Sequence, residues 1–93
     1  MSPTVHALRN QIRVAVGRYE RDVSSAFTKE ALAAVCEAVD ADIETTPTPS
    51  KSEMRAAILV AIGESDEFDP DAHDSALRKA ELQAVADALE AQS

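Results

Sequence analysis

The chain has 93 residues, of which 45% are hydrophobic and 3% aromatic, and its formal net charge is −8. A chain of this length forms one domain with a modest core. The single cysteine, Cys36, excludes an internal disulfide framework, and no stretch offers the ~20 apolar residues that a membrane-spanning helix needs. Because the N-terminus also lacks a signal-peptide pattern, we expect a cytoplasmic protein, or one inside a particle assembled in the cytoplasm.

The acidic balance, with 17 Asp and Glu against 9 Lys and Arg, resembles that of proteins from extreme halophiles. In such cells, molar salt screens the repulsion between like charges. An ordinary acidic protein of a mesophile is the alternative interpretation. Under the halophilic interpretation, an acidic total does not exclude nucleic-acid binding.

Four segments show helical periodicity, and the first two lie in the N-terminal half. The first runs from Thr4 to Val16 or Tyr19. Its apolar face consists of Val5, Leu8, Ile12, Ala15, Val16 and Tyr19. The second begins at Thr28, a good N-cap, with Phe27 and Leu32 placed as a hydrophobic staple. Its apolar face consists of Leu32, Val35, Cys36 and Val39.

The third segment follows an extended link that ends at Pro49, and Ser50 to Glu53 reads as a capping box. Its apolar face consists of Met54, Ile58, Ala61 and Ile62, and Gly63 marks its end. The fourth segment is predicted to begin between Asp71 and Ser75, with Asp71 or Asp74 as N-cap. It carries Leu77, Leu82, Val85 and Leu89.

The two halves of the chain resemble each other. Residues 3–17 align without gaps on 49–63, and residues 27–39 align on 77–89. The matched pairs include Pro3/Pro49, Arg9/Arg55, Gly17/Gly63, Lys29/Lys79 and Leu32/Leu82. Chance similarity between alanine-rich helices is the alternative. The sequence predicts an all-α fold in one domain, residues 1–93, with two repeated helix–loop–helix units at about 3–43 and 49–91.

Residues 27–62 place a short helix, an extended link and a second capped helix in the order Phe27 … Leu32 … Val39 … Ser50 … Ile58. This pattern resembles the helix–extended–helix class that includes the SAP, LEM, HeH and Rho N-terminal-like domains. The link is longer than usual, and Asp40-Ala41-Asp42 replaces the glycine common after the first helix. The resemblance implies a binding module for DNA or protein.

Cationic residues are the candidates for a nucleic-acid site. The positions that match the basic patch of the DNA-binding members are Lys51 and Arg55, with Lys29 nearby. Arg9 and Arg13, four residues apart on one helical stripe, extend the set. The alternative role of this arginine stripe is in salt bridges to the acidic remainder or to a neighbouring subunit. Two or three cations would bind phosphates weakly and lose affinity as salt rises.

Other residues give no pattern typical of catalysis or of metal binding. The acidic loop from Glu64 to Asp74 lacks the glycine of an EF-hand, so we interpret it as solvated. His6 and His73 are far apart in sequence, and Cys36 lies on an apolar stripe. We therefore expect no enzyme activity, no cofactor, no metal ion and no small-molecule substrate.

The sequence favours a non-catalytic interaction or assembly protein that binds another protein or copies of itself. An adaptor or connector, such as those in tailed-virus particles, is one such setting. The alternative is a DNA-binding accessory protein of the SAP/HeH type.

Overall fold

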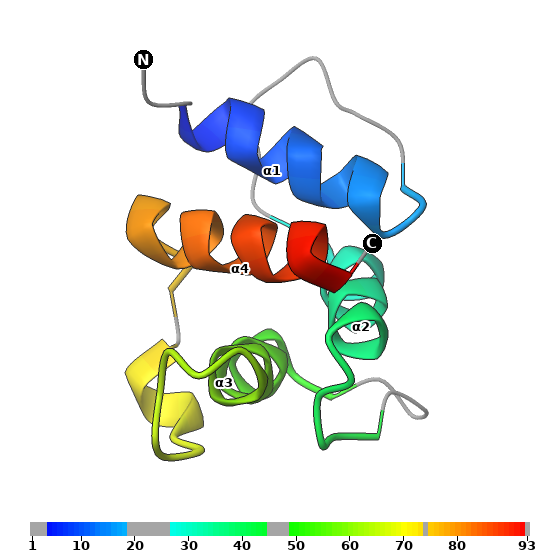
Figure 1. Ribbon diagram of the computed structural model, residues 1–93. Helices are drawn as coiled ribbons and strands as arrows, with labels where there is room; N and C mark the ends of the chain where they lie inside the picture. Colours follow the sequence, from blue (N-terminus) through cyan, green and yellow to red (C-terminus); the bar gives the residue numbers. More distant parts are fainter. Residues whose placement is uncertain (1–3, 19–26, 45–48, 74, 93) are drawn as a thin grey trace.

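Four α-helices surround one apolar core in the computed structural model, which describes residues 4–18, 27–44, 49–73 and 75–92 (Figure 1). The elements in chain order are α1 (Val5–Ala15), α2 (Lys29–Ala38), α3 (Lys51–Ala61), the short 3-10 helix η1 (Pro70–His73) and α4 (Lys79–Gln92). No strand occurs in these ranges, and the all-α fold class predicted from the sequence is confirmed. In the same ranges, no helix combines the length and the apolar character needed to cross a membrane.

The first three helices begin at hydroxyl N-caps. Thr4, Thr28 and Ser50 have extended backbones, and their side-chain oxygens accept from the backbone N–H three residues on, over 3.0, 3.2 and 3.3 Å. The Ser50 hydroxyl also bonds Glu53 Oε1 at 3.1 Å. These bonds satisfy N–H groups that a helix start otherwise leaves without a partner. The predicted caps at Thr28 and Ser50 are confirmed.

After the C-cap of each of these three helices, the next residue adopts the left-handed conformation. Gly17 and Gly63 have φ values of +80° and +83°, and Asp40 takes this place after α2 with φ +57°. The predicted stop at Gly63 is confirmed. α1 ends at Ala15, and Tyr19, predicted as part of its face, lies outside the described residues.

The predicted start of the fourth helix is wrong. Residues 70–73 form η1, a single 3-10 turn, and α4 begins at Lys79. Glu81 Oε1 accepts the backbone N–H of Arg78 at 2.8 Å, which is the second half of a capping box. The N-cap position holds Arg78 rather than Asp, Asn, Ser or Thr, so the usual start signal is missing there.

The main helix contacts join the two halves of the chain. α1 packs on α4 and α2 packs on α3, while η1 covers a further side of α3. The buried core combines side chains of all four helices with Phe27 and Leu77, which precede α2 and α4. The radius of gyration is 12.0 Å, close to the ~12 Å of one compact domain of this length. The two halves therefore share one core.

Two alanines predicted to face the core, Ala15 and Ala61, are exposed at the last turns of α1 and α3. Conversely, α3 buries six consecutive residues, from Met54 to Leu59. η1 covers a side of the helix that the amphipathic pattern assigns to solvent, and this explains the wider burial.

Positions that align between the two halves also have matching structure. α1 and α3 each span 11 residues, and their N-caps, Thr4 and Ser50, are 46 positions apart, as are Gly17 and Gly63. Exchanging the halves would convert the α1–α4 contact into the α3–α2 contact, as expected for an internal twofold relation. The duplication itself stays a prediction.

Candidate functional site

The five cations predicted as a nucleic-acid site differ in how much of each side chain is exposed. Lys29 and Lys51 are exposed, and Arg9 is partly buried. Arg13 and Arg55 are only 2% and 7% exposed, so they have little surface to offer to a phosphate. The burial of these two arginines weakens the DNA alternative.

Arg13 makes its contacts within the protein. Its Nη1 donates to Asn10 Oδ1 at 2.8 Å, and its guanidinium carbon lies 5.2 Å from the centroid of the Phe27 ring. A guanidinium over an aromatic face gains a cation–π attraction. These contacts hold the segment before α2 against α1.

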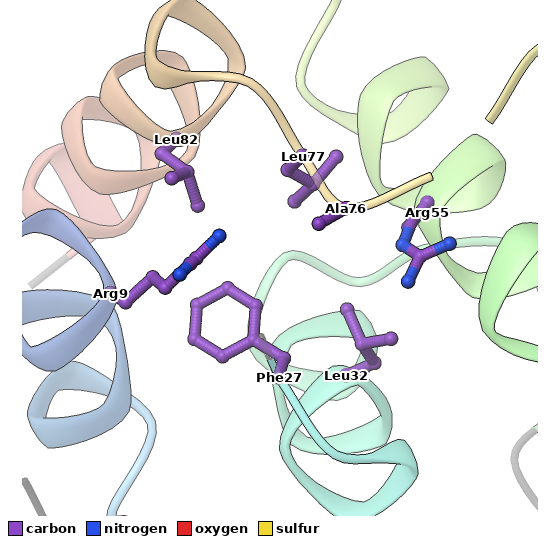
Figure 2. Close-up of a pocket in the computed structure, with 7 residues that line it drawn as sticks. All are labelled: Arg9, Phe27, Leu32, Arg55, Ala76, Leu77 and Leu82. Carbon is purple, nitrogen blue, oxygen red and sulfur yellow. The ribbon is translucent and has the colours of Figure 1, made fainter. Parts of the chain in front are cut away.

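Arg9 and Arg55 are brought together, although they are 46 positions apart in the chain. Both line a small pocket whose walls are Phe27, Leu32, Ala76, Leu77 and Leu82 (Figure 2). Arg55 Nη1 donates to the backbone oxygen of His73 at 3.0 Å. The alignment of the halves pairs these two arginines, but it does not predict that they share a pocket.

A groove between α3, the segment that follows α2 and the loop before η1 exposes apolar side chains. It has a volume of about 420 Å³. It is lined by Asp40, Asp42, Ala57, Val60, Ala61 and Phe68. We call this feature the α2/α3 groove. Val60 and Phe68, 38% and 53% exposed, supply its apolar walls, while both aspartates are exposed at its acidic side.

Local structure on both sides positions the walls of the groove. After α3, the left-handed Gly63 turns the chain, and the backbone N–H of Ser65 bonds the Leu59 carbonyl at 3.2 Å. The Ser65 hydroxyl then donates to the Glu67 carbonyl at 2.9 Å, which orders the segment that carries Phe68. On the α2 side, the left-handed conformation of Asp40 directs the chain toward Asp42.

Sequence reasoning missed this groove because its members come from a helix end, a link and an acidic loop. Phe68 was assigned to no helix face. The available signal was an aromatic residue within a run of carboxylates, a position where burial is not expected. A large exposed aromatic side chain beside other apolar surface is typical of an interaction site.

A related hollow lies between α1 and α4. Its volume is about 270 Å³. Its lining residues are Gln11, Ile12, Ala15, Ala86, Leu89 and Glu90. Gln11 and Ala15 align with Ala57 and Ala61 of the α2/α3 groove. The two hollows differ in chemistry, since the α1/α4 hollow has no counterpart of Phe68 among its lining residues.

The other polar candidates are separate from each other. The Cys36 thiol is buried, and this burial, with a smaller contribution from the Glu37 charge, raises its pKa to about 11. A thiol with this pKa is protonated at neutral pH and is a poor nucleophile. His6 contacts Asn10 within α1, and His73 lies 3.9 Å from Glu81. Across the described ranges, no three His, Cys, Asp or Glu side chains gather where they could hold a metal ion.

Comparison of the chain with known protein families, with curated protein sequences and with solved structures found no match. The resemblance of residues 27–62 to the helix–extended–helix class stays a prediction, and residues 45–48 of its link lie outside the described residues. The structure thus defines a small all-α protein whose surface carries a groove with apolar walls and two aspartates at one side.

Proposed function

We propose that this protein is a non-catalytic assembly protein, and that the α2/α3 groove binds the end of α1 from a second copy. The observation that carries the proposal is the exposed apolar surface of Val60 and Phe68 beside two carboxylates. An apolar patch of this kind gains free energy when a partner side chain removes it from water.

The charges of the groove select its occupant. Asp40 and Asp42 stand at one side, and the loop that carries Phe68 adds Glu64, Asp66, Glu67 and Asp69. A complementary partner surface is apolar and basic. Two grooves facing each other in a symmetric dimer would bring like charges together, so the charges favour a contact between different surfaces of the two copies.

The chain itself presents a surface with these properties at the end of α1. Val14 is 57% exposed and, with Val60 and Phe68, belongs to the large apolar side chains at the described surface. Arg18, one turn further on, is also exposed. Residues 1–21 contain four arginines against one glutamate, but Arg13 is buried and Arg9 is partly buried, so the exposed positive charge among the described residues of this segment comes from Arg18. We call Val14, Ala15 and Arg18 the α1 tip.

Insertion of the α1 tip into the groove of another copy is a head-to-tail contact. Such contacts use two different surfaces and generate rings or open filaments rather than closed twofold dimers. The contact is small, so we expect weak pairwise binding that becomes significant at high local concentration. A connector or adaptor role is one setting in which many such contacts add up.

Light scattering across a concentration series tests the proposal. Asp42→Lys and Arg18→Glu should each weaken self-association roughly tenfold, because each places like charges in the contact. Combining both changes in one chain should restore association, since the ion pair is then re-formed with reversed signs. Asp87→Lys, the same charge change on the exposed side of α4, is the matched control and should have no effect. A wild type that stays monomeric at all concentrations would contradict the proposal.

The DNA alternative predicts a different result in the same assay. A short duplex at ~0.1 M salt should then co-elute with the wild-type protein, and the double change Lys29→Glu with Lys51→Glu, at the two exposed candidates, should abolish this co-elution. Binding of this kind, with no self-association, would favour the SAP/HeH interpretation over the assembly proposal.

A further inference from the structure

Two guanidinium groups converge on one small pocket between α1 and α3. Figure 2 shows Arg9 and Arg55 entering from opposite sides, with the Phe27 ring and the leucines of the α2 and α4 segments around the space between them. The pocket has a volume of about 10 Å³. This is about the smallest space that holds one water molecule. A halide ion is somewhat larger than water, so its entry requires the two arginine side chains to move slightly apart.

The positive charge at this place has no acidic counterpart within the described part of the chain. Arg55 is 7% exposed, and its recorded partner is a neutral group, the backbone oxygen of His73. Among the described residues, no carboxylate forms an ion pair with Arg9 or Arg55. A guanidinium carries five N–H donors, so most of the donors of Arg55 are left over. Buried arginines are rare unless an anion accompanies them.

We propose that this pocket binds a small monovalent anion of the halide class, held between the guanidinium groups of Arg9 and Arg55. The size of the pocket excludes sulfate and phosphate, which carry four oxygens around a central atom. The apolar walls disfavour strongly hydrated ions, whereas guanidinium is itself weakly hydrated and pairs well with a weakly hydrated anion. Chloride meets the hydration condition and is the smallest halide that does so.

The bound anion links the two halves of the molecule. Arg9 belongs to α1, and Arg55 belongs to α3 and also bonds the backbone of η1, so one ion would contact charges from two helices and, through Arg55, tie η1 to them. An anion that binds the folded chain alone stabilises it by mass action. Above the dissociation constant of the site, each tenfold increase in chloride should raise the folding equilibrium constant by up to tenfold. This inference is independent of the assembly proposal, since none of the groove residues takes part.

Urea unfolding at constant sodium concentration tests the site, with chloride replaced stepwise by gluconate, a bulky anion that cannot enter. The folding equilibrium constant of the wild type should rise with the chloride fraction, and bromide should substitute for chloride. Arg9→Gln, at a partly exposed position, should abolish this difference between anions while leaving the protein folded. Arg78→Gln, at an exposed arginine that does not line the pocket, is the matched control and should retain the difference. Equal stability of the wild type in chloride and in gluconate would overturn the proposal.

A second variant distinguishes a bound chloride ion from a carboxylate of the chain itself as the group that neutralises the arginines. Asp74 follows His73 directly in the chain and lies outside the described residues. If its carboxylate neutralised the two arginines, Asp74→Asn would gain a dependence on chloride that the wild type lacks, and the proposal would be wrong. In crystals grown with bromide, the anomalous signal should show a peak between the Arg9 and Arg55 guanidinium groups. Bromide-grown crystals without that peak would also refute the site.

Discussion

Arg55 of α3 donates a hydrogen bond from Nη1 to the backbone oxygen of His73, 3.0 Å away, and so fastens η1 to the helix that it covers. The bond spans 18 positions of the chain and joins the middle helix to the segment that leads into α4. The wide burial of α3 depends on this cover.

We predict that Arg55→Ala lowers the free energy of unfolding by about 2 kcal/mol, because a partly buried, charge-assisted hydrogen bond to the His73 oxygen is lost. Arg9→Ala, at the aligned position of α1, has no hydrogen bond of this kind and should cost less than about 1 kcal/mol. Urea unfolding of both variants at low chloride measures the difference. Equal losses would show that the bond to His73 does not stabilise η1.

Substitutions at the left-handed residues that follow α2 and α3 should change the free energy of unfolding in opposite directions. Gly63 has a φ of +83° and open space around its Cα, so Gly63→Ala should destabilise the protein by about 1 kcal/mol through backbone strain alone. Asp40 holds the same conformation with a side chain, and Asp40→Gly should stabilise the fold by up to about 1 kcal/mol. Thermal unfolding of the two variants checks the signs. A loss of stability in Asp40→Gly would indicate that the Asp40 side chain stabilises the α2 end.

The cap of α3 provides a third test. Ser50→Ala should cost about 1 kcal/mol, because the Glu53 N–H and the Glu53 carboxylate both lose the hydroxyl. Ser50→Gly should cost only a few tenths, since glycine at an N-cap leaves the N–H groups open to water. Urea unfolding with a constant m-value would measure both. Equal costs for Ala and Gly would contradict the role of the cap.

Because the Cys36 thiol titrates differently in the folded and unfolded chain, the free energy of unfolding should depend on pH in the alkaline range. Burial raises its pKa from about 9 in the unfolded chain to about 11, so between these values the folded protein keeps a proton that the unfolded chain releases. Stability due to this group is fully present below pH 9 and falls by up to about 2–3 kcal/mol as pH rises to 11.

Comparison with Cys36→Ala isolates this contribution, since both proteins share every other titrating group. The free energy of unfolding of the wild type should fall more steeply than that of the variant between pH 8 and pH 10.5. Parallel curves would show that the thiol ionises equally well in the folded protein.

Local signals in the sequence predicted most of the first three helices. Hydroxyl caps and glycine stops act within one turn of the chain, and the structure has them at Thr28, Ser50 and Gly63. The start of α4 was predicted wrongly because its N-cap position holds Arg78, which is not a typical N-cap residue, and the hydrogen bond at this end comes from the later residue Glu81. The alignment of Lys29 with Lys79 indicates the correct start of α4, since α2 and α4 begin at these two lysines.

Helical periodicity in the sequence could not predict features that depend on packing between distant segments. The burial of Arg55 requires η1, which the sequence did not predict. The α2/α3 groove requires Phe68 to stand beside Val60, across a loop whose path the composition does not define. Charge and composition therefore predicted an acidic binding protein, while the surfaces themselves emerge only from the tertiary arrangement.

A mixing experiment tests the assembly proposal most directly. Val14→Ser removes the α1 tip but keeps the groove, and Phe68→Ser removes a wall of the groove but keeps the tip. Each variant alone should be monomeric in sedimentation, and their mixture should form a 1:1 dimer that grows no further, because only one complete contact remains. A mixture that sediments as monomers, or a Val14→Ser protein that self-associates as strongly as the wild type, would contradict head-to-tail assembly through the α2/α3 groove.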